Sequence, residues 1–525
     1  MGILAKSWVA GLCGLGLMAS TAAPAAPWIK AQSDHFTVYS NVDAKTTSAY
    51  LTKLEQYRFV LERFYDLPPA FDEHSPRFNV YFLDGRMDLS QVKPGLPQGV
   101  AGFYTGCAFG DADFAVYRYD DIRETKTVAD QAENDSQIIL FHEYAHAFMF
   151  QDSSAIYPRW YVEGFAEYYG STRIQGDQVE VGKAWSGRYR TLLGGEALPY
   201  EDLLRSAKSL QSSPEKTQAF YAQSWLLTHY FLATPEREDK LHAYFAAYEK
   251  GEDPVTAFER TTGIAVKDLP KVLDAYLQSK EAVTLTVHLK DMPLTANVAI
   301  TPLPASAKKL LLWDAADRVC AMGDSKPLLA NIRTEAAKFP TDDYAQLAWA
   351  RAENILGDES LPLNFLTAYT QRRPDDPEGM FLLGLSYYLM TSHSHIADGE
   401  TAETQMKKAR NAFGKVYQLD PTNATNLYFF ALAHSDLPDY PDDNTVTAAV
   451  EAHALAPSTV RFAVLAANLL IRTGKTDEAK TVLYPLASNP HNDKLSRWAT
   501  AIIAAIDSGA KKEDLLGMLA QSWSN

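Results

Sequence analysis

The sequence predicts two structural parts, an α+β domain in the first half of the chain and an all-α domain of helical repeats in the second. Three observations support this prediction. Strand-like and helix-like segments alternate before residue 120, helical periodicity dominates from 134 to about 280, and loop prolines recur after 325. At 525 residues the chain is also too long for one core, since cores stop growing near roughly 250–300 residues. We expect domains at 26–280 and 325–525, separated by a β segment or linker at 281–324.

The first 25 residues have the features of a signal peptide. Lys6 supplies positive charge, Trp8–Met18 is a short apolar run, and Ala23-Pro24-Ala25 is a small-residue cleavage site. The apolar run is shorter than the about 20 residues that span a bilayer. We expect an exported protein, periplasmic or secreted, without a transmembrane segment after signal removal. A lipoprotein signal is one alternative, although Leu12 before Cys13 fits it poorly, and an N-terminal core helix is another.

Composition and charge exclude several classes of function. Hydrophobic residues make up 46% of the chain and charged residues 22%, which is typical of a soluble globular protein. The formal net charge of −16, without clustered Lys and Arg, argues against nucleic-acid binding. After signal removal the remaining thiols are Cys107 and Cys320, which an oxidising compartment would allow to pair. The sequence does not establish that they meet, and neither has the context of a zinc ligand.

The first part opens with strands and helices in turn. Phe36–Tyr39 and Phe78–Leu83 read as strands, and Thr46–Tyr65 between them reads as an amphipathic helix. The stretch Lys93–Gly106 is rich in Gly and Pro and is expected to be a loop. Asp113–Tyr119 alternates apolar and polar residues like an exposed strand.

From Asn134 the pattern is helical almost to residue 280, with breaks at Asp152–Tyr157, Gly194–Gly195 and Thr234-Pro235. Strict alternation then returns at Val283, Leu285, Val287 and Leu289, and Val298–Pro302 is short and β-branched, which indicates a small β segment or linker.

The last 200 residues are predicted to form helix pairs. Recurrent loop prolines are spaced by 37, 44, 36 and 33 residues, close to the 34-residue period of tetratricopeptide repeats; they are Pro340, Pro377, Pro421, Pro457 and Pro490. In the best unit, Gly384–Tyr388 and Ala412-Phe413 resemble that repeat's Gly–Tyr first helix and Ala–Phe second helix. Such an array would offer a surface for a protein partner. An ordinary helical domain is the alternative.

The segment His142-Glu143-Tyr144-Ala145-His146 is a HExxH motif. On a helix, this spacing puts both imidazoles on one face, where neutral nitrogens can bind one Zn²⁺ at about 2.0–2.1 Å. Glu143 between them would reach a water rather than the metal. A chance match on a buried helix is the alternative.

A second helix is predicted shortly after the motif. Pro158 suits its first turn and Gly170 its end, which places Glu163 and Glu167 one turn apart. Two such helices can present His, His and Glu to one ion and leave a fourth position open, as catalytic rather than structural zinc sites do.

Together, HEYAH and WYVEGFAEY resemble the gluzincin metallopeptidases, most closely the aminopeptidase-type WLNEGFA helix. With the signal peptide and the repeats, the chain also looks like the peptidase MA-like bacterial proteins. The resemblance implies a zincin-type fold over residues 28–280, with His142, His146 and Glu163 as zinc ligands and Glu143 as general base. It also implies that Glu167 orients His142 through the other ring nitrogen. A solvated helix carboxylate is the alternative for Glu167.

The same resemblance extends to Phe220–Leu227, where Tyr221 occupies the place of a tyrosine that stabilises the oxyanion. A packed aromatic is its alternative role. The Gly-x-Met-Glu-Asn segment with which aminopeptidases recognise a free amine is missing, so exopeptidase action is not supported.

The expected function is zinc-dependent hydrolysis of a peptide or protein substrate, with Asp113–Tyr119 pairing an extended substrate as an added strand. Two alternatives stay open. One is a catalytically silent, zinc-containing scaffold that binds partners through its helical repeats, and the other is a zinc hydrolase of a non-peptide amide. No GxSxG, Walker loop or CxxC pair supports another chemistry.

Overall fold

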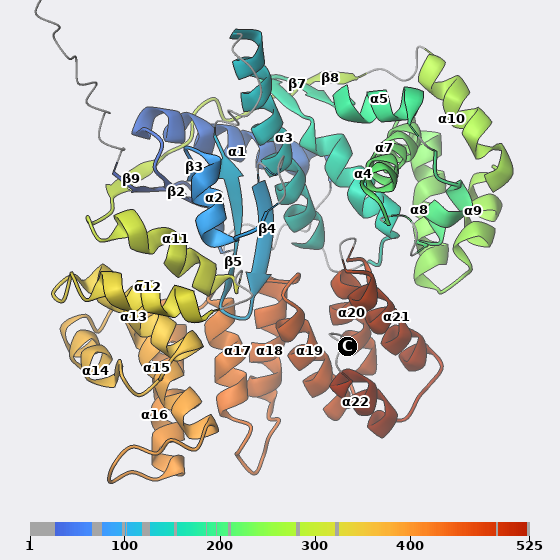
Figure 1. Cartoon of the computed structure of the whole chain (residues 1–525). Coiled ribbons are helices and arrows are strands. Elements are labelled where there is room, and N and C mark those ends of the chain that lie inside the picture. The colour runs from blue at the N-terminus through green and yellow to red at the C-terminus, as the bar shows by residue number, and fades with distance from the viewer. Residues whose placement is uncertain are drawn as a thin grey trace, which may run out of the picture.

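The computed structural model describes most of the chain after the expected signal peptide, and that peptide, residues 1–25, lies outside the described part. The described residues are 27–65, 76–96, 100, 102–117, 126–151, 155–184, 186–195, 197–207, 210, 212–279, 284–320, 325–489 and 492–521. A mixed helix-and-sheet part is followed by a large all-helical part, as predicted (Figure 1). No helix within the described ranges is long and apolar enough to cross a membrane.

A six-stranded sheet forms the first layer, in the order β4-β5-β3-β2-β1-β9. Strands β2, β3 and β5 are parallel neighbours, whereas β4, β1 and β9 each pair antiparallel with their neighbours. The strands are β1 (Ile29–Gln32), β2 (Phe36–Ser40), β3 (Phe78–Leu83), β4 (Gly102–Cys107), β5 (Gly110–Val116) and β9 (Ala299–Pro302).

The sheet is covered on both faces because its strands are apolar on both. On β3, Val80 and Phe82 enter the core shared with α1 (Ala44–Phe64) and α3 (Lys126–Gln151). The alternate residues Tyr81 and Leu83 enter a second core with α2 (Arg86–Val92) and α11 (Ala307–Arg318).

Two predictions for the sheet are wrong. Residues of Lys93–Gly106 were expected to form a loop, but β4 begins at Gly102. Glycine occurs there because the strands approach closely, since a Cβ on Gly106 would lie 2.6 Å from Asp111 Cβ. The strand predicted at Asp113–Tyr119 corresponds to β5 as far as Val116, with residues 118–119 outside the described part, and β5 is buried there and lies between β3 and β4. Both of its edges are therefore occupied, and it cannot accept an added substrate strand.

A helical layer follows the sheet along the chain and lies beside it (green in Figure 1). Its helices are α3, α4 (Arg159–Gly170), α5 (Ser186–Gly194), α6 (Tyr200–Leu204), α7 (Pro214–Phe231), α8 (Pro235–Glu249), α9 (Pro254–Thr262), the short 3-10 helix η3 (Val266–Asp268) and α10 (Leu269–Gln278). The predicted breaks after Gly194 and at Thr234 are confirmed, because α5 ends at Gly194 and Thr234 caps α8.

The helical stretch differs from the prediction at two points. Helix α3 begins at Lys126 and runs through Asn134, which was expected near its start. A small sheet interrupts the helices, formed by β6 (Arg173–Gln175) and β7 (Gln178–Val181), which the sequence did not indicate, and by β8 (Leu285–His288), which lies in the predicted β segment. The expected β segment after residue 280 thus belongs to the first part, since β8 pairs with β7 and β9 pairs with β1.

The all-helical part begins at Ala307, earlier than residue 325, and consists of successive packed helices along the lower side of Figure 1. In the best-predicted unit, α15 (Pro377–Ser392) packs on α16 (Ala402–Leu419) at Gly384, where a Cβ would lie 3.0 Å from the Cβ of Ala412. The helices after α11 are α12 (Lys326–Ala336), α13 (Asp343–Leu356), α14 (Leu363–Arg372), α15 (Pro377–Ser392), α16 (Ala402–Leu419), α17 (Ala424–Ala433), α18 (Asp443–Leu455), α19 (Val460–Arg472), α20 (Thr476–Ala487), α21 (Asp493–Asp507) and α22 (Lys512–Ala520).

The two parts are joined by several contacts. Cys107 at the end of β4 forms a disulfide with Cys320 just after α11, so these two thiols do meet. Beside it, the Phe109 and Phe429 rings stack with centroids 5.6 Å apart. The Tyr157 amide donates to Ser488 Oγ at 2.9 Å, between the loop before α4 and the residue after α20. The helical part therefore packs against the hairpin tip and the loop that connects α3 to α4.

Candidate metal centre

Helix α3 carries both histidines of the motif and is fixed by aromatic packing. Phe141 stacks on Tyr57 of α1 at 3.8 Å between ring centroids, and the Tyr57 hydroxyl donates to the Phe141 carbonyl at 3.0 Å. His142 and His146 follow on another face of the helix, one turn apart, with ring centroids 4.7 Å apart.

Helix α4 brings Glu163 to the histidines because two glycines let it approach its neighbours closely. A Cβ on Gly170 would lie 3.1 Å from the backbone of His142, and one on Gly164 would lie 2.5 Å from the Ser224 carbonyl oxygen of α7. Every residue of α4 is buried, and Glu163 is 0% exposed. The short connection between α3 and α4 and the close helix contacts therefore fix the position of the Glu163 carboxylate.

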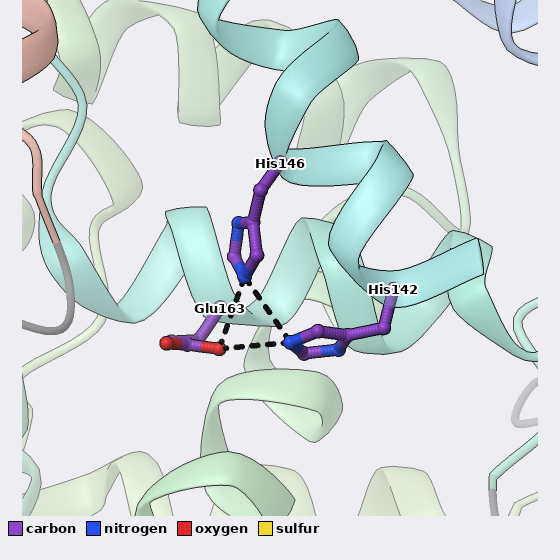
Figure 2. Close-up of side chains that lie close together, drawn as sticks. All are labelled: His142, His146 and Glu163. Atoms are coloured by element: carbon purple, nitrogen blue, oxygen red, sulfur yellow. Dashed lines mark hydrogen bonds and ion pairs between the residues drawn. The ribbon is translucent and has the colours of Figure 1, made fainter. Parts of the chain in front are cut away.

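The three predicted ligand groups converge (Figure 2). The two imidazole Nε2 atoms lie 3.1 Å apart, and Glu163 Oε2 lies 3.4 Å from Nε2 of His142 and 3.5 Å from Nε2 of His146. In the part of the chain that the structure describes, no other three His, Cys, Asp or Glu side chains converge in this way. The arrangement could hold one metal ion through two nitrogens and one oxygen.

The carboxylates around His142 control its protonation. Burial alone would lower the pKa of His142, but the hydrogen bond to Glu163 and the charges of Glu167, Glu163 and Glu143 together raise that pKa to about 9. In the metal-free protein this imidazole is therefore cationic at neutral pH, and a metal ion must displace its proton to bind.

Glu167 lies near Nδ1 of His142, the ring nitrogen that does not face Glu163. Its Oε1 is 3.5 Å from Nδ1 of His142. The same carboxylate accepts two hydrogen bonds from the guanidinium of Arg188 on α5, at 2.9 and 2.8 Å. Burial opposes the charge of Arg188, but Glu167 outweighs it and raises the Arg188 pKa. Glu167 is thus a buried, ion-paired carboxylate and not a solvated one.

Sequence reasoning missed Arg188. Its signal is weak, since it is one of several Arg residues in a stretch without a motif, and only the fold packs α5 against α7 and brings Arg188 to Glu167. Arg188 also donates to Gln218 Oε1 on α7, and its guanidinium lies over the ring of Tyr221, 4.8 Å from the centroid. One side chain thereby connects α4, α5 and α7.

Tyr221 lies beside the centre. Its ring meets that of His142 edge-on, with centroids 6.3 Å apart. The charge of Glu163, together with burial and the nearby Glu167 and Glu143, raises the Tyr221 pKa, so the phenol keeps its proton and can donate a hydrogen bond. Further along the same helix, Nδ1 of His229 lies at hydrogen-bond distance from the Tyr276 hydroxyl, 2.7 Å away. Burial lowers the pKa of His229 to about 4.

A cavity of about 410 Å³ lies between the end of the sheet and the helical part. Ala147, which directly follows His146 on α3, and Phe150, one turn after His146, line it on one side, and Tyr104 of β4 lines it on another. Loops of the helical part close the remaining side, including Ser458, which lies 3.0 Å from the Tyr104 hydroxyl. The helical part therefore closes a cavity that lies beside the helix carrying His146.

Comparison with known proteins adds a family and one solved structure. Residues 139–252 match a family described as protein of unknown function (DUF1570), and this segment contains every residue of the centre described above. A crystal structure of a thermophilic TPR protein from Thermus thermophilus is 20% identical and covers 38% of this chain and 98% of its own, with a TM-score of 0.31. That score is too low to assign the fold. No curated protein matches the chain.

Proposed function

We propose that the chain is a zinc-dependent peptidase of the gluzincin type, in which His142, His146 and Glu163 hold one Zn²⁺. One observation carries the proposal. Ligand atoms about 2.0–2.1 Å from a tetrahedral zinc ion lie about 3.3–3.4 Å from one another. The three ligand atoms here are 3.1, 3.4 and 3.5 Å apart, so they fit three corners of such a tetrahedron without rearrangement.

The donor set supports a catalytic rather than a structural ion. Two imidazoles and one carboxylate leave a fourth position, whereas structural zinc sites have four protein ligands. When bound, zinc supplies Lewis acidity, which polarises a carbonyl group and lowers the pKa of a coordinated water to about 7.

The side chains around the ligands have distinct roles in this proposal. Glu143 takes a proton from the attacking water and delivers it to the leaving amine. Tyr221 donates a hydrogen bond to the substrate oxygen as negative charge develops there. Glu167 orients His142 through Nδ1, and Arg188 holds Glu167 in place.

An extended peptide would bind along β4 rather than β5. Within the described sheet, β4 is an edge strand that is only partly buried, and α3 packs across it. An edge strand offers unpaired backbone groups to a peptide of any sequence. The zincin-type fold is part of the same proposal, because the motif helix lies between this sheet and α4.

Export and partner binding complete the proposal. The disulfide between Cys107 and Cys320 is stable in an oxidising compartment such as a periplasm or the cell exterior. The helical part, packed beside the centre, offers a surface that could present a protein substrate.

The decisive experiment compares the mature chain with Glu143→Gln and His146→Ala. Metal analysis should find about one zinc per chain in the wild type and in Glu143→Gln, and little in His146→Ala. Digestion of a peptide library, followed by mass spectrometry, should detect cleavage by the wild type alone.

Each alternative predicts another result. A silent scaffold would retain zinc and cleave nothing in any variant. A hydrolase of non-peptide amides would leave the peptides intact but cleave small amide substrates in a Glu143-dependent way. Absence of zinc from the wild type after growth in zinc-containing medium would refute the proposal itself.

A further inference from the structure

A second cavity, of about 220 Å³, lies where the sheet meets the helical part. Lys30, Tyr39 and Tyr81 line it from β1, β2 and β3, and Tyr344 lines it from α13; we call it the tyrosine-lined cavity. Pockets for drug-sized ligands measure about 300–1,000 Å³, so this one suits a smaller molecule. Neither the proposed metal ligands nor Glu143 line it, so its role is independent of the proposed function.

Four hydrogen-bond donors line this cavity and have no acceptor among the described residues. Lys30 lies opposite Tyr39 on the neighbouring strand, and the Tyr39 ring stacks on that of Tyr81 with centroids 5.0 Å apart. The Tyr344 hydroxyl is buried, and no described group accepts its hydrogen. Within the same described ranges, the hydroxyls of Tyr39 and Tyr81 and the Lys30 ammonium have no hydrogen bond or ion pair either. Buried polar groups normally have a partner, so four such donors around one cavity favour a ligand rich in acceptors.

The three phenols keep their protons. Burial is the largest cause that raises the pKa of Tyr39, of Tyr81 and of Tyr344. Each phenol therefore has one hydrogen to donate at neutral pH, and the Lys30 ammonium has three.

The two carboxylates on the cavity wall are already paired. Asp314 of α11 accepts hydrogen bonds from Arg318 at 2.9 Å and from Arg351 at 3.1 Å. Glu378 of α15 accepts from the same two guanidinium groups, at 2.7 Å from Arg318. Two cations thus neutralise two anions, and Lys30 adds a positive charge without a counter-ion among the described residues. Burial lowers the pKa of Lys30 more than the charge of Glu378 raises that pKa, so an anion beside Lys30 would be stabilised.

We propose that the tyrosine-lined cavity binds a small organic monocarboxylate with an apolar substituent. The two oxygens of a carboxylate offer about four lone-pair positions, which matches the four donors, and its single charge matches Lys30. Leu303, Leu311 and Leu347 line the same cavity and would contact the hydrocarbon part. Inorganic phosphate, by contrast, would leave these leucines without an apolar partner.

The cavity has a route of entry. Tyr39, Tyr81 and Arg318 also line the larger cavity of about 410 Å³, so the two cavities adjoin. A small ligand can therefore reach the four donors through the larger cavity, without separation of the sheet from the helical part.

Isothermal titration calorimetry of the mature chain tests the proposal with three probes in the millimolar range. They are 4-methylpentanoate, the matching neutral alcohol 4-methylpentan-1-ol, and inorganic phosphate. We expect 4-methylpentanoate to bind with one site per chain, and the alcohol and phosphate to bind at least about 10-fold more weakly, because hydrogen bonds to a charged group are the stronger ones.

Two conservative variants locate the site. Tyr344→Phe removes only the hydroxyl and should weaken 4-methylpentanoate binding by about 3- to 10-fold. Lys30→Met keeps the apolar stem, loses the charge and should weaken binding by about 10-fold or more. The matched controls are Tyr417→Phe and Lys45→Met, which change exposed side chains outside the cavity and should leave binding unchanged.

A carboxylate could also bind a zinc ion, so the same titration is repeated with His146→Ala, which removes a proposed metal ligand. Binding that persists in His146→Ala and weakens in Lys30→Met and Tyr344→Phe would support the tyrosine-lined cavity, whether or not the chain cleaves peptides. Binding that His146→Ala abolishes and Lys30→Met leaves unchanged would place the carboxylate at the metal centre and overturn the proposal.

The remaining outcomes also count against it. If none of the three probes bound, the cavity would not be a carboxylate site. Equal affinity for the alcohol would show that charge plays no part, and tighter binding of phosphate would reject an organic carboxylate as the ligand.

Discussion

The ion pair between Arg188 and Glu167 offers the sharpest test of how the centre is supported. Both side chains are buried, with 8% and 5% of their surfaces exposed, and they share two hydrogen bonds of 2.8 and 2.9 Å. We predict that Arg188→Met lowers the free energy of unfolding of the metal-free protein by about 3–5 kcal/mol, because the buried Glu167 carboxylate would lose both hydrogen bonds from its closest cationic partner.

The same substitution should weaken zinc binding. Without Arg188, the Glu167 carboxylate is free to turn away from Nδ1 of His142, from which it is now 3.5 Å distant. Loss of such a supporting contact typically costs 10- to 100-fold in metal affinity, or about 1.4–2.7 kcal/mol.

Urea denaturation in the presence of chelator measures the first effect, and competition with a chromophoric chelator measures the second. Arg188→Lys should fall between Arg188→Met and wild type, because an ammonium retains the charge but not the two-pronged geometry. The control is Arg190→Met on the same helix, since Arg190 is exposed and its removal should cost no more than about 0.5 kcal/mol.

The double variant Arg188→Met/Glu167→Leu should recover most of the lost stability, because it also removes the buried carboxylate that lost its Arg188 hydrogen bonds. If Arg188→Met cost less than about 1 kcal/mol, like the exposed control, the pair would not support the centre and the reasoning would be refuted.

Three further predictions concern the metal, the helix packing and the junction of the two parts. His142 has a pKa of about 9 in the metal-free protein against 6.5 for the free side chain, so its stabilising contribution is complete below pH 6.5 and disappears as pH rises through 9. Zinc must displace this proton, so its apparent affinity should rise about tenfold per pH unit up to pH 9, and calorimetry in two buffers at pH 7 should detect about one released proton. Gly164→Ala should destabilise the protein by about 1–3 kcal/mol or more, because the added Cβ would press on Thr228. Gly414→Ala, in open space on α16, should instead stabilise the protein by about 0.5–1 kcal/mol. Thermal denaturation of the two variants and the wild type measures both effects. Replacing both cysteines of the disulfide by alanine removes a cross-link over 213 residues and should cost about 2–5 kcal/mol in urea denaturation, while an unchanged midpoint would show that packing alone holds the junction.

The errors of the sequence-based prediction share one physical origin. The strand that begins at Asp113 was predicted to be exposed on one face, because a carboxylate at an alternating position normally faces water. In the structure that position is fully buried, on a strand that packs against α3. Gly102 and Gly106 contributed to the prediction of a loop. In the structure they belong to a strand, and glycine is required at both positions because neighbouring atoms leave no room for a side chain. In both cases the residue type reflects a neighbour that is distant in sequence.

The predictions that succeeded depended on local order. The spacing of His142 and His146 puts both on one face of any helix that contains them, and the Gly384 and Ala412-Phe413 pattern predicted a packed helix pair that the structure contains. The proposed zinc chemistry, the enzyme activity and the export of the chain remain predictions.

The sequence by itself determined which residues share a helix face and where strands and helices begin to alternate, because periodicity and propensity act over a few neighbouring residues. Only the tertiary structure decided that Glu163 meets the two imidazoles, that Arg188 holds Glu167 and that β4 lies at an edge of the described sheet. These contacts join segments that are separated along the chain, and packing of whole elements against one another selects them.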